Sequence, residues 1–267
     1  MADTGRVASP SSPWADLDRP PLRVPALRRA LEPEGWRVEV LGTTASTNAV
    51  VAERARAGEP AGLVVVAEQQ TAGRGRLDRL WVSPARAGLT FSVLLRPDWP
   101  PAQWPWLPLL TGLAVAGAVR EQTGLDARVK WPNDVLVEDR KVCGVLVEVP
   151  AAGSAVVGIG LNVTTRAEEL PHAVGTSLQL EGATTTDRDT LLRAVLRQLM
   201  DVLAEPVASR ADYRALCATV GRRVQVTVPG GGTVAGLAEA VDDDGRLVVD
   251  GVPLGAGDVV HATLADG

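Results

Sequence analysis

The chain has 267 residues, of which 46% are apolar and 22% charged, with a net charge of -5 and a pI near 5.2. This length and apolar content suffice for one large domain with a sizeable core plus a small one. The acidic balance argues against a general binder of nucleic acid or of membrane surfaces, which needs a basic field over its whole site. Two cysteines, Cys143 and Cys217, provide neither a disulfide framework nor a zinc-binding spacing.

The first segment, residues 1–35, is expected to be a largely disordered leader. Its opening part is rich in Pro, Ser and Asp without periodicity, and only VPALRRALE (24–32) has a helical pattern. It lacks the basic and then apolar order of a signal peptide, and the longest apolar stretch of the chain is too short to span a bilayer. We therefore expect a cytoplasmic protein.

Residues 36–219 alternate between strand and helix patterns. Strands are expected at 36–42, 62–69 and 88–97, and a helix is expected at 46–58, capped by Ser46 or Thr47 and ended by Gly58. A helix of about five turns follows at 104–124. Short strands rich in β-branched residues come next at 127–131, 135–138, 141–149 and 155–163, and helices at 187–205 and 209–220 close this part.

Residues 220–267 have a different pattern. Val-x-Val alternation is interrupted by the turn signals Pro229-Gly230, Asp244-Gly245 and Asp250-Gly251, which predicts a small antiparallel barrel of about five strands. The expected fold class is α+β: a mixed sheet packed with helices over 36–219, which would form the catalytic domain, and a C-terminal SH3-like barrel over 220–267.

The segment GRGRLDR (73–79) places three arginines on a glycine-containing loop. Gly73 and Gly75 allow backbone amides to approach a ligand, and the planar guanidinium groups of Arg74, Arg76 and Arg79 match phosphate or carboxylate oxygens in pairs. An ordinary flexible surface turn is the alternative interpretation. Neither a P-loop nor a G-x-G-x-x-G motif occurs, so kinase and dinucleotide-binding interpretations are disfavoured.

Two further motifs contain chemically active residues. Lysine occurs only at 130 and 141, although arginine supplies the other 25 basic residues, which favours a specific use for a compact point charge over two lysines placed by chance. The turn expected at Trp131-Pro132-Asn133-Asp134 would present its last two side chains at a sheet edge. The third motif, GIGLN (158–162), is equally consistent with close backbone approach to a ligand and with a bulged strand.

Taken together, STN (46–48), QTAGRGR (70–76), Trp81, KWPND (130–134), DRK (139–141) with Gly144, and GIGLN resemble the bacterial biotin protein ligases over residues 36–267. The resemblance implies an enzyme that converts biotin and ATP to biotinyl-5'-AMP. It would then transfer biotin to a lysine of the biotin carboxyl carrier domain of an acyl-CoA carboxylase.

The resemblance also assigns residues. Arg74, Arg76 and Lys141 would be the catalytic cations. The biotin-binding set would be Ser46, Thr47, Asn48, Gln70, Gly73, Arg74, Gly75, Arg76, Trp81, Lys141, Gly144 and Gly158. The ATP-binding set would be Arg76, Arg79, Lys130, Asn133 and Asn162. Mg²⁺ bound to ATP would be held with the help of Asp134 or Lys130.

The arginine loop is expected to close over the adenylate, because an acyl adenylate reacts with water. Asp78 departs from the glycine that many family members have there and adds a negative charge to this loop. The only histidines, His172 and His261, lie in no motif, so a covalent enzyme intermediate is not expected, and Cys143 is expected to fill a small buried site.

The sequence leaves two alternative functions and the oligomeric state open. A lipoate-type acyl ligase or transferase would share the sheet architecture, and a biotin-sensing or nucleic-acid-binding module is the non-enzymatic alternative. Only about 35 residues precede the catalytic region, too few for the DNA-binding winged helix of some family members, so ligase activity without repressor activity is expected. The oligomeric state is undetermined, with a homodimer among the alternatives.

Overall fold

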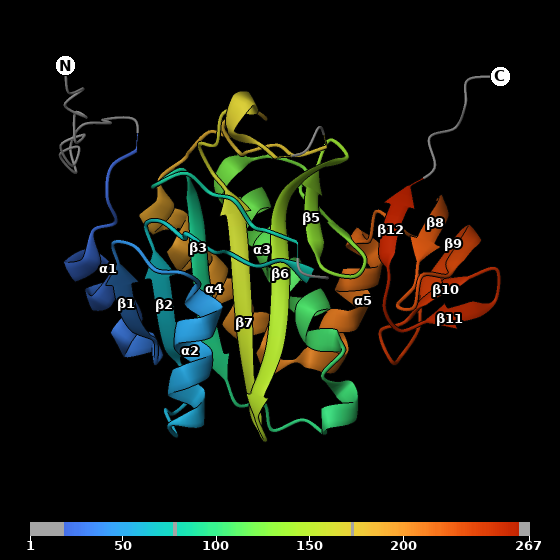
Figure 1. Cartoon of the computed structure of the whole chain (residues 1–267), viewed down its shortest axis with the longest axis horizontal. Coiled ribbons are helices and arrows are strands. Elements are labelled where there is room, and N and C mark those ends of the chain that lie inside the picture. The colour runs from blue at the N-terminus through green and yellow to red at the C-terminus, as the bar shows by residue number, and fades with distance from the viewer. Residues whose placement is uncertain (1–18, 77–78, 172–173, 262–267) are drawn as a thin grey trace, which may run out of the picture.

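A seven-stranded sheet forms the centre of the molecule in this computed structural model, which describes residues 19–76, 79–171 and 174–261 (Figure 1). The strand order is β1-β2-β3-β7-β6-β5-β4, with β1 and β2 parallel and all other neighbours antiparallel. The strands are β1 (Arg37–Leu41), β2 (Leu63–Ala67), β3 (Gly88–Leu95), β4 (Arg128–Lys130), β5 (Asp134–Val137), β6 (Arg140–Ala151) and β7 (Ser154–Asn162).

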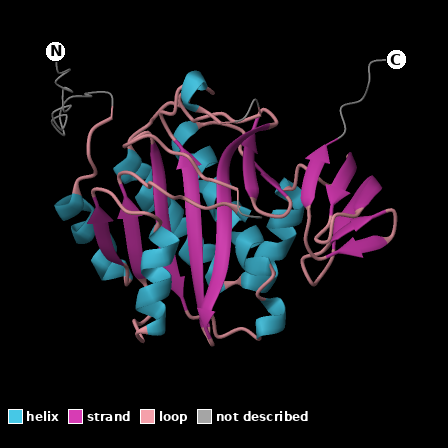
Figure 2. Ribbon diagram, viewed as in Figure 1, coloured by secondary structure: helices cyan, strands magenta, loops and turns pink. Residues whose placement is uncertain are grey.

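Helices cover both faces of this sheet (Figure 2). On one face lie α3 (Trp106–Thr123) and α4 (Arg188–Ala204), while α2 (Thr47–Arg56) packs on the other. Thirteen of the 18 residues of α3 are buried, as expected for a largely apolar helix, and Gly124 ends it at a φ of 74°. The N-cap of α2 is Ser46, whose hydroxyl accepts a hydrogen bond from the amide of Ala49.

The remaining helices have 11 residues or fewer. They are α1 (Val24–Leu31), α5 (Pro206–Leu216) and the 3₁₀ turns η1 (Glu32–Glu34), η3 (Pro101–Gln103) and η4 (Ala167–Glu169). None of the helices in the described ranges is both long and apolar enough to cross a bilayer.

The C-terminal unit is an antiparallel five-stranded sheet with the order β11-β10-β9-β8-β12. Its strands are β8 (Arg223–Thr227), β9 (Thr233–Val241), β10 (Leu247–Val249), β11 (Val252–Leu254) and β12 (Asp258–His261). Two buried indoles fix it to the large domain: Trp131 Nε1 donates to the carbonyl of Gly245 at 2.9 Å, and Trp106 Nε1 to that of Asp243 at 2.8 Å. The predicted α+β class, with a helix-packed mixed sheet and a separate C-terminal β unit, is confirmed.

The second half of the predicted leader differs from the expectation. Helix α1 buries Leu27 and Leu31 in the main core, and Arg19, itself buried, binds Glu169 at 2.6 Å and the carbonyl of Thr164 at 2.8 Å. Residues 19–35 are therefore an ordered part of the large domain, because the partners that bury them lie far along the chain. Residues 1–18 lie outside the described residues.

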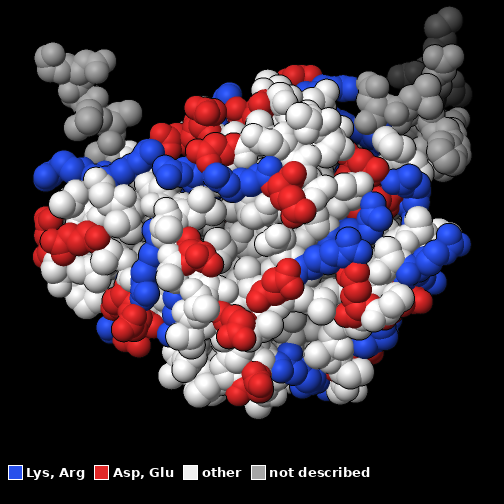
Figure 3. Space-filling model, turned by 180° about the vertical axis from the view of Figure 1, so that it is seen from behind, with Lys and Arg blue, Asp and Glu red and all other residues white. Residues whose placement is uncertain are grey.

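Charged side chains are mixed in sign on the face shown in Figure 3, where acidic and basic groups alternate over the surface. This agrees with the modest net charge of -5.

Candidate active site

The floor of the main cavity is a patch of the sheet that lacks large side chains. On β7 the odd-numbered residues of 157–161 point into the core shared with α3 and α4. Because side chains alternate along a strand, Gly158 and Gly160 face the opposite side, toward α2. Gly160 pairs with Gly144 on β6, and Gly158 pairs with Ser92 on β3. The missing side chains leave space above the sheet at the N-terminal end of α2.

Two side chains from outside the sheet lie over these glycines. A Cβ atom at position 158 would come within 2.1 Å of Asn48 Oδ1, and one at position 160 within 2.3 Å of Trp81 Cε2. Neither distance is physically allowed, so Gly158 and Gly160 are required for Asn48 and Trp81 to lie flat on the sheet. The glycines of the GIGLN motif therefore shape the pocket through close packing.

A chain of hydrogen bonds begins beside this floor. Gln70 Oε1 accepts from the Thr47 amide at 2.7 Å and from its hydroxyl at 3.0 Å. The Thr47 hydroxyl also lies 2.7 Å from that of Ser92, which is fully buried on β3. Ser92 thereby connects the end of α2 with the centre of the sheet.

The chain continues from Ser92 to the arginine loop. Ser92 Oγ is 2.5 Å from Asn48 Oδ1, and Asn48 Nδ2 donates to Glu148 Oε2 at 2.7 Å. The other oxygen of Glu148 pairs with Arg74 at 3.3 Å. Four separate segments of the chain thus meet in one polar wall: α2, residues 70–74, β3 and β6.

The arginine loop closes on itself through its backbone. The Trp81 amide donates to the Gly73 carbonyl at 2.9 Å, and the Gly75 amide to the Arg79 carbonyl at 2.6 Å. Gly73 lies outside the cavity lining, and a Cβ there would be 2.5 Å from the Trp81 carbonyl oxygen. Gly73 therefore allows the two sides of the loop to come into contact.

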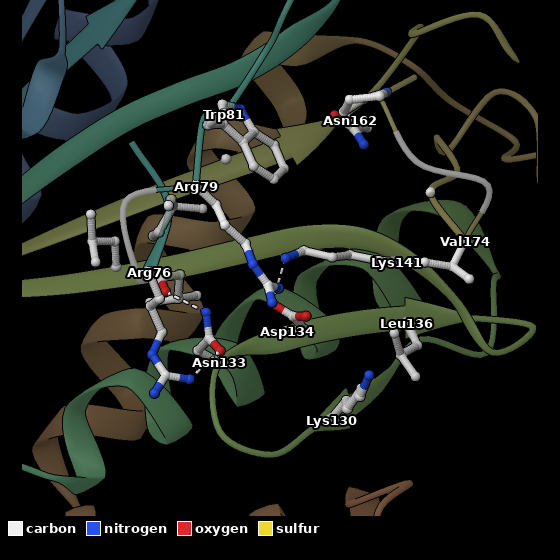
Figure 4. Close-up of a pocket in the computed structure, with 18 of the residues that line it drawn as sticks. Arg76, Arg79, Trp81, Lys130, Asn133, Asp134, Leu136, Lys141, Asn162 and Val174 are labelled. Carbon is white, nitrogen blue, oxygen red and sulfur yellow. Dashed lines mark hydrogen bonds and ion pairs between the residues drawn. The ribbon is translucent and has the colours of Figure 1, made fainter. Parts of the chain in front are cut away.

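The side chains of this loop reach the C-terminal unit. Arg76 donates to Asn133 Oδ1 and to the Gly257 carbonyl, both at 3.1 Å, and Arg79 forms an ion pair with Asp258 at the start of β12. Burial lowers the pKa of the Arg76 guanidinium. Figure 4 shows Arg76 next to Asn133 and the side chain of Arg79 extending toward Asp134.

Lys141 projects from β6 toward the same space (Figure 4). Its ammonium nitrogen is 2.7 Å from Asp134 Oδ1 and 5.8 Å from the centroid of the Trp81 ring. Its backbone is held by the neighbouring segment, since its amide donates to the Val174 carbonyl and its carbonyl accepts from the Thr176 amide, each at 2.8 Å. The lysine therefore stands on a fixed backbone, with its charge beside the indole.

Lys130 and His261 form the end of the cavity toward the C-terminal unit. Burial lowers the pKa of the Lys130 ammonium. Burial, together with the charges of Lys130 and Arg222, lowers the pKa of His261 to about 4, so its ring is neutral near pH 7. His261 Nε2 lies 3.2 Å from the Thr219 hydroxyl.

The cavity has a volume of about 1160 Å³ and brings together every predicted site residue except Gly73. These are Ser46, Thr47, Asn48, Gln70, Arg74, Gly75, Arg76, Arg79, Trp81, Lys130, Asn133, Asp134, Lys141, Gly144, Gly158 and Asn162. The lining combines neutral hydrogen-bonding groups over a flat floor with seven Lys and Arg side chains. Such a site suits a ligand with a neutral polar head and an anionic tail beside a polyphosphate.

Some residues of the site were missed by sequence reasoning. Ser92 and Glu148 lie in strands behind the lining, where they bond to Thr47 and Asn48, and belong to no motif. Asp258 and His261 line the cavity from the C-terminal unit. A polar residue inside the otherwise apolar strand GLTFSVLLRP was the one available signal for Ser92. The others become visible only when distant strands are paired.

An α+β domain with a cationic loop over such a pocket is typical of enzymes that activate a carboxylate with a nucleotide. Comparison with known proteins identifies the family within this class. Residues 40–164 match the Biotin/lipoate A/B protein ligase family, and residues 219–261 match the Biotin protein ligase C terminal domain. The chain is 43% identical to the biotin--[acetyl-CoA-carboxylase] ligase of Mycobacterium tuberculosis, over 92% of this chain and 98% of that protein.

Other relatives agree. The bifunctional ligase/repressor BirA of Escherichia coli is 33% identical, over 81% of this chain and 70% of that protein. The structure of the biotin protein ligase from Aquifex aeolicus in complex with biotin and ATP superimposes with a TM-score of 0.74 at 29% identity, covering 85% of this chain and 99% of that one. The chain belongs to the biotin protein ligase family.

Proposed function

We propose that this protein is a biotin-[biotin carboxyl-carrier protein] ligase. It joins biotin to ATP as biotinyl-5'-AMP and then transfers biotin to a lysine of the biotin carboxyl carrier domain of an acyl-CoA carboxylase. The observation that carries this proposal is the convergence of the arginine loop and Lys141, from separate parts of the chain, on one cavity with a polar wall. The structure of the Aquifex aeolicus relative was solved in complex with biotin and ATP, which supports this proposal.

The neutral end would take the bicyclic ring of biotin. Thr47 and Gln70 lie in the polar wall, and the Trp81 ring lies over Gly160 where a flat ring system could pack against it. Ser46 combines an N-cap hydrogen bond with a place in the lining. These residues would hold the ureido group and the ring, while the acyl chain extends toward the cations.

The cationic end would carry out adenylation. One biotin carboxylate oxygen attacks the α-phosphorus of ATP, the bond to the bridging oxygen breaks, and pyrophosphate leaves with its electron pair. Two anions must approach each other in this step, and charge accumulates on the phosphoryl oxygens, so fixed cations lower the barrier. Arg74, Arg76 and Lys141 are the candidates. Arg79 and Lys130 would bind the nucleotide, and Asn133 and Asn162 line the same cavity with amides that already bond to Arg76 and to the Thr176 carbonyl.

Transfer needs no further protein nucleophile. The amine of the carrier lysine attacks the acyl carbon of the adenylate, AMP leaves with the electron pair of the acyl-phosphate bond, and the amine proton passes to solvent. Cys143 has no part in this scheme, because it is fully buried and burial raises the pKa of its thiol.

Mg²⁺ bound to the phosphates suits the residues present. This ion needs only one or two protein carboxylates when phosphates supply other ligands. Asp134 lines the cavity, with its Oδ1 2.7 Å from the Lys141 ammonium, and its carboxylate would be a ligand of the ion. The ion would neutralise phosphate charge while Lys141 remains available to the biotin carboxylate. We further propose a cytoplasmic location, which the two unpaired cysteines, Cys143 and Cys217, support.

The test is a complete reaction with purified protein, biotin, Mg-ATP and a carrier domain. We expect pyrophosphate release and the mass increase of one biotinyl group on the carrier, and neither product with lipoate in place of biotin. Lys141→Gln should reduce adenylation on the order of 10²-fold, as removal of one charge-stabilising group does in other enzymes. Arg140→Gln is the matched control, because Arg140 is the adjacent cation on β6 but pairs with Glu181 at 2.7 Å. Modification with lipoate, or none with biotin, would refute the proposal.

A further inference from the structure

We infer that Glu148 and Ser92 are positioning residues that fix which groups of the polar wall donate and which accept hydrogen bonds, and thereby set its selectivity for a cyclic urea. This inference rests on the proposed function and concerns how the same pocket reads its ligand. Neither residue belongs to a sequence motif of the site. Both act through Asn48, Thr47 and Gln70.

The direction of the hydrogen bonds is set first at Glu148, because a carboxylate can only accept hydrogen bonds. Asn48 must therefore direct its Nδ2 toward Glu148, at 2.7 Å, and its Oδ1 toward Ser92. The Leu146 carbonyl, 3.4 Å from Nδ2, is a second acceptor on the same side. The opposite amide orientation would place Oδ1 against two acceptors. Asn48 is held over Gly158 and only 4% exposed, so its amide has little freedom to move away.

Ser92 in turn fixes the direction of the hydrogen bond at Thr47 in α2. Its hydroxyl has one hydrogen, which must go to Asn48 Oδ1 at 2.5 Å because that oxygen cannot donate. Thr47 Oγ1 lies 2.7 Å from Ser92 Oγ, and because the Ser92 hydrogen is committed to Asn48, Ser92 can offer Thr47 only a lone pair. Ser92 is 0% exposed, so no water competes for these bonds.

The last members of the chain face the ligand space. The hydroxyl hydrogen of Thr47 is directed to Ser92 or to Gln70 Oε1, both inside the wall, so Thr47 Oγ1 can offer only its lone pairs to the cavity. Gln70 Oε1 is already bound by the Thr47 amide at 2.7 Å, which leaves Nε2 as the donor end of that side chain. The wall thus has one defined acceptor and one defined donor. A cyclic urea, with a carbonyl acceptor between two N–H donors, complements such a wall.

Glu148 has a second contact that the test must separate. Its other oxygen pairs with Arg74 at 3.3 Å, so Glu148→Gln also changes the setting of an arginine proposed to bind the ligand carboxylate. Ser92→Ala leaves that pair in place and removes only the hydroxyl between Asn48 and Thr47. The serine variant therefore isolates the ordering effect.

The experiment measures the dissociation constants of biotin and of 2-iminobiotin by calorimetry. In the analogue an imino group, which can donate, replaces the ureido carbonyl. We expect Ser92→Ala and Glu148→Gln each to weaken biotin binding about tenfold and to lower the preference for biotin over 2-iminobiotin, because each leaves a buried polar group without its partner. The double variant should lose little more than Glu148→Gln, since both residues act in one chain, and the KM for Mg-ATP should stay at the wild-type value.

Ser154→Ala is the matched control. Ser154 is also a fully buried serine of the sheet, but it bonds to the Ala151 carbonyl at 2.9 Å, at the far end of β7. An unchanged preference for biotin over 2-iminobiotin in Ser92→Ala and Glu148→Gln, even with weaker binding of both ligands, would overturn the inference and leave only a packing role. Failure of the wild-type protein to bind biotin would instead refute the proposed function.

Discussion

Arg76 connects three parts of the molecule: the arginine loop, the turn before β5 and the C-terminal unit. Its hydrogen bonds to Asn133 and to the Gly257 carbonyl hold it over the cavity, and burial, although it lowers the pKa, leaves a guanidinium charged at neutral pH. A cation held in this way should retain an anionic intermediate. Removal of the Arg76 side chain should weaken retention of the adenylate more than it weakens binding of the substrates.

We therefore predict that Arg76→Gly releases biotinyl-5'-AMP into solution. In a reaction without carrier, chromatography of the protein-free filtrate should detect free adenylate accumulating over several turnovers, whereas the wild-type protein should retain about one equivalent. Arg96→Gly serves as the control, because Arg96 is an exposed arginine after β3 that bonds to the Glu59 carbonyl. An adenylate that stays bound to Arg76→Gly would contradict the proposed role of the loop.

His261 should make the fold sensitive to acid. Its pKa is lowered from 6.5 to about 4 by burial and by Lys130 and Arg222, against the attraction of Asp139. The folded protein prefers the neutral ring, so this contribution to stability is complete above the unfolded pKa and is lost as the pH falls from about 6.5 toward 4. Urea unfolding at pH 7 and at pH 5 should show a smaller loss of stability for His261→Asn than for the wild type. An identical loss in both proteins would mean that His261 is hydrated and free to ionise.

Among single residues, the sequence predicts those site residues that belong to a recognisable motif. Arg74, Arg76, Lys141 and Asn133 belong to short, unusual runs, and the structure gathers them in one cavity. Glu148 gives no such signal, because a glutamate on a strand is ordinarily a solvated side chain. Its position beside Arg74 depends on strand register across the sheet.

The arginine loop is the element whose order should depend most on ligands. In the described residues its backbone closes through a few hydrogen bonds, while its side chains bind Asn133 and Asp258 from other elements; residues 77 and 78, including Asp78, lie outside the description. These contacts are few compared with those of a strand in the sheet. Bound adenylate would add charge-assisted hydrogen bonds to the same arginines.

We expect hydrogen exchange at residues 72–80 to slow markedly when biotin and Mg-ATP are both present, and to change little with either alone. Mass spectrometry of peptides from this segment measures the effect, and a peptide from β7 supplies an internal reference. Equal protection with and without ligands would show that the loop is already closed in the free protein and would refute its role as a lid.

At the scale of elements, strand and helix patterns predicted most of the sheet, because alternation and apolar runs reflect which face is buried. The extent of the leader was the exception. The eight residues of α1 form an unremarkable pattern by themselves, and the burial of Leu27 and Leu31 depends on contacts with β1 and α4. The ion pair between Arg19 and Glu169 joins positions 150 residues apart, which no local pattern reveals.

The stability of the whole molecule depends on the joint, which is the contact between the large domain and the C-terminal unit. Trp131 is 1% exposed, and its indole donates to Gly245 across that joint. We predict that Trp131→Ala destabilises the protein by about 3–5 kcal/mol, the usual cost of deleting a buried aromatic side chain. Denaturant unfolding gives the value.

Trp104→Ala is the comparison, because Trp104 is only partly buried and bonds locally to Trp99. We expect it to cost clearly less. A similar cost for both tryptophans would mean that the joint contributes no more to stability than the surface of the large domain.

The joint also determines when the site is complete during synthesis. Arg76 binds Gly257, and the cavity wall includes His261, and both of these residues belong to the C-terminal unit. A nascent chain that still has these residues inside the ribosome has its sheet and its arginine loop but not the last part of the pocket. Biotin activation should therefore begin only once the strands of the C-terminal unit have emerged and paired, so that nascent chains without them do not consume ATP.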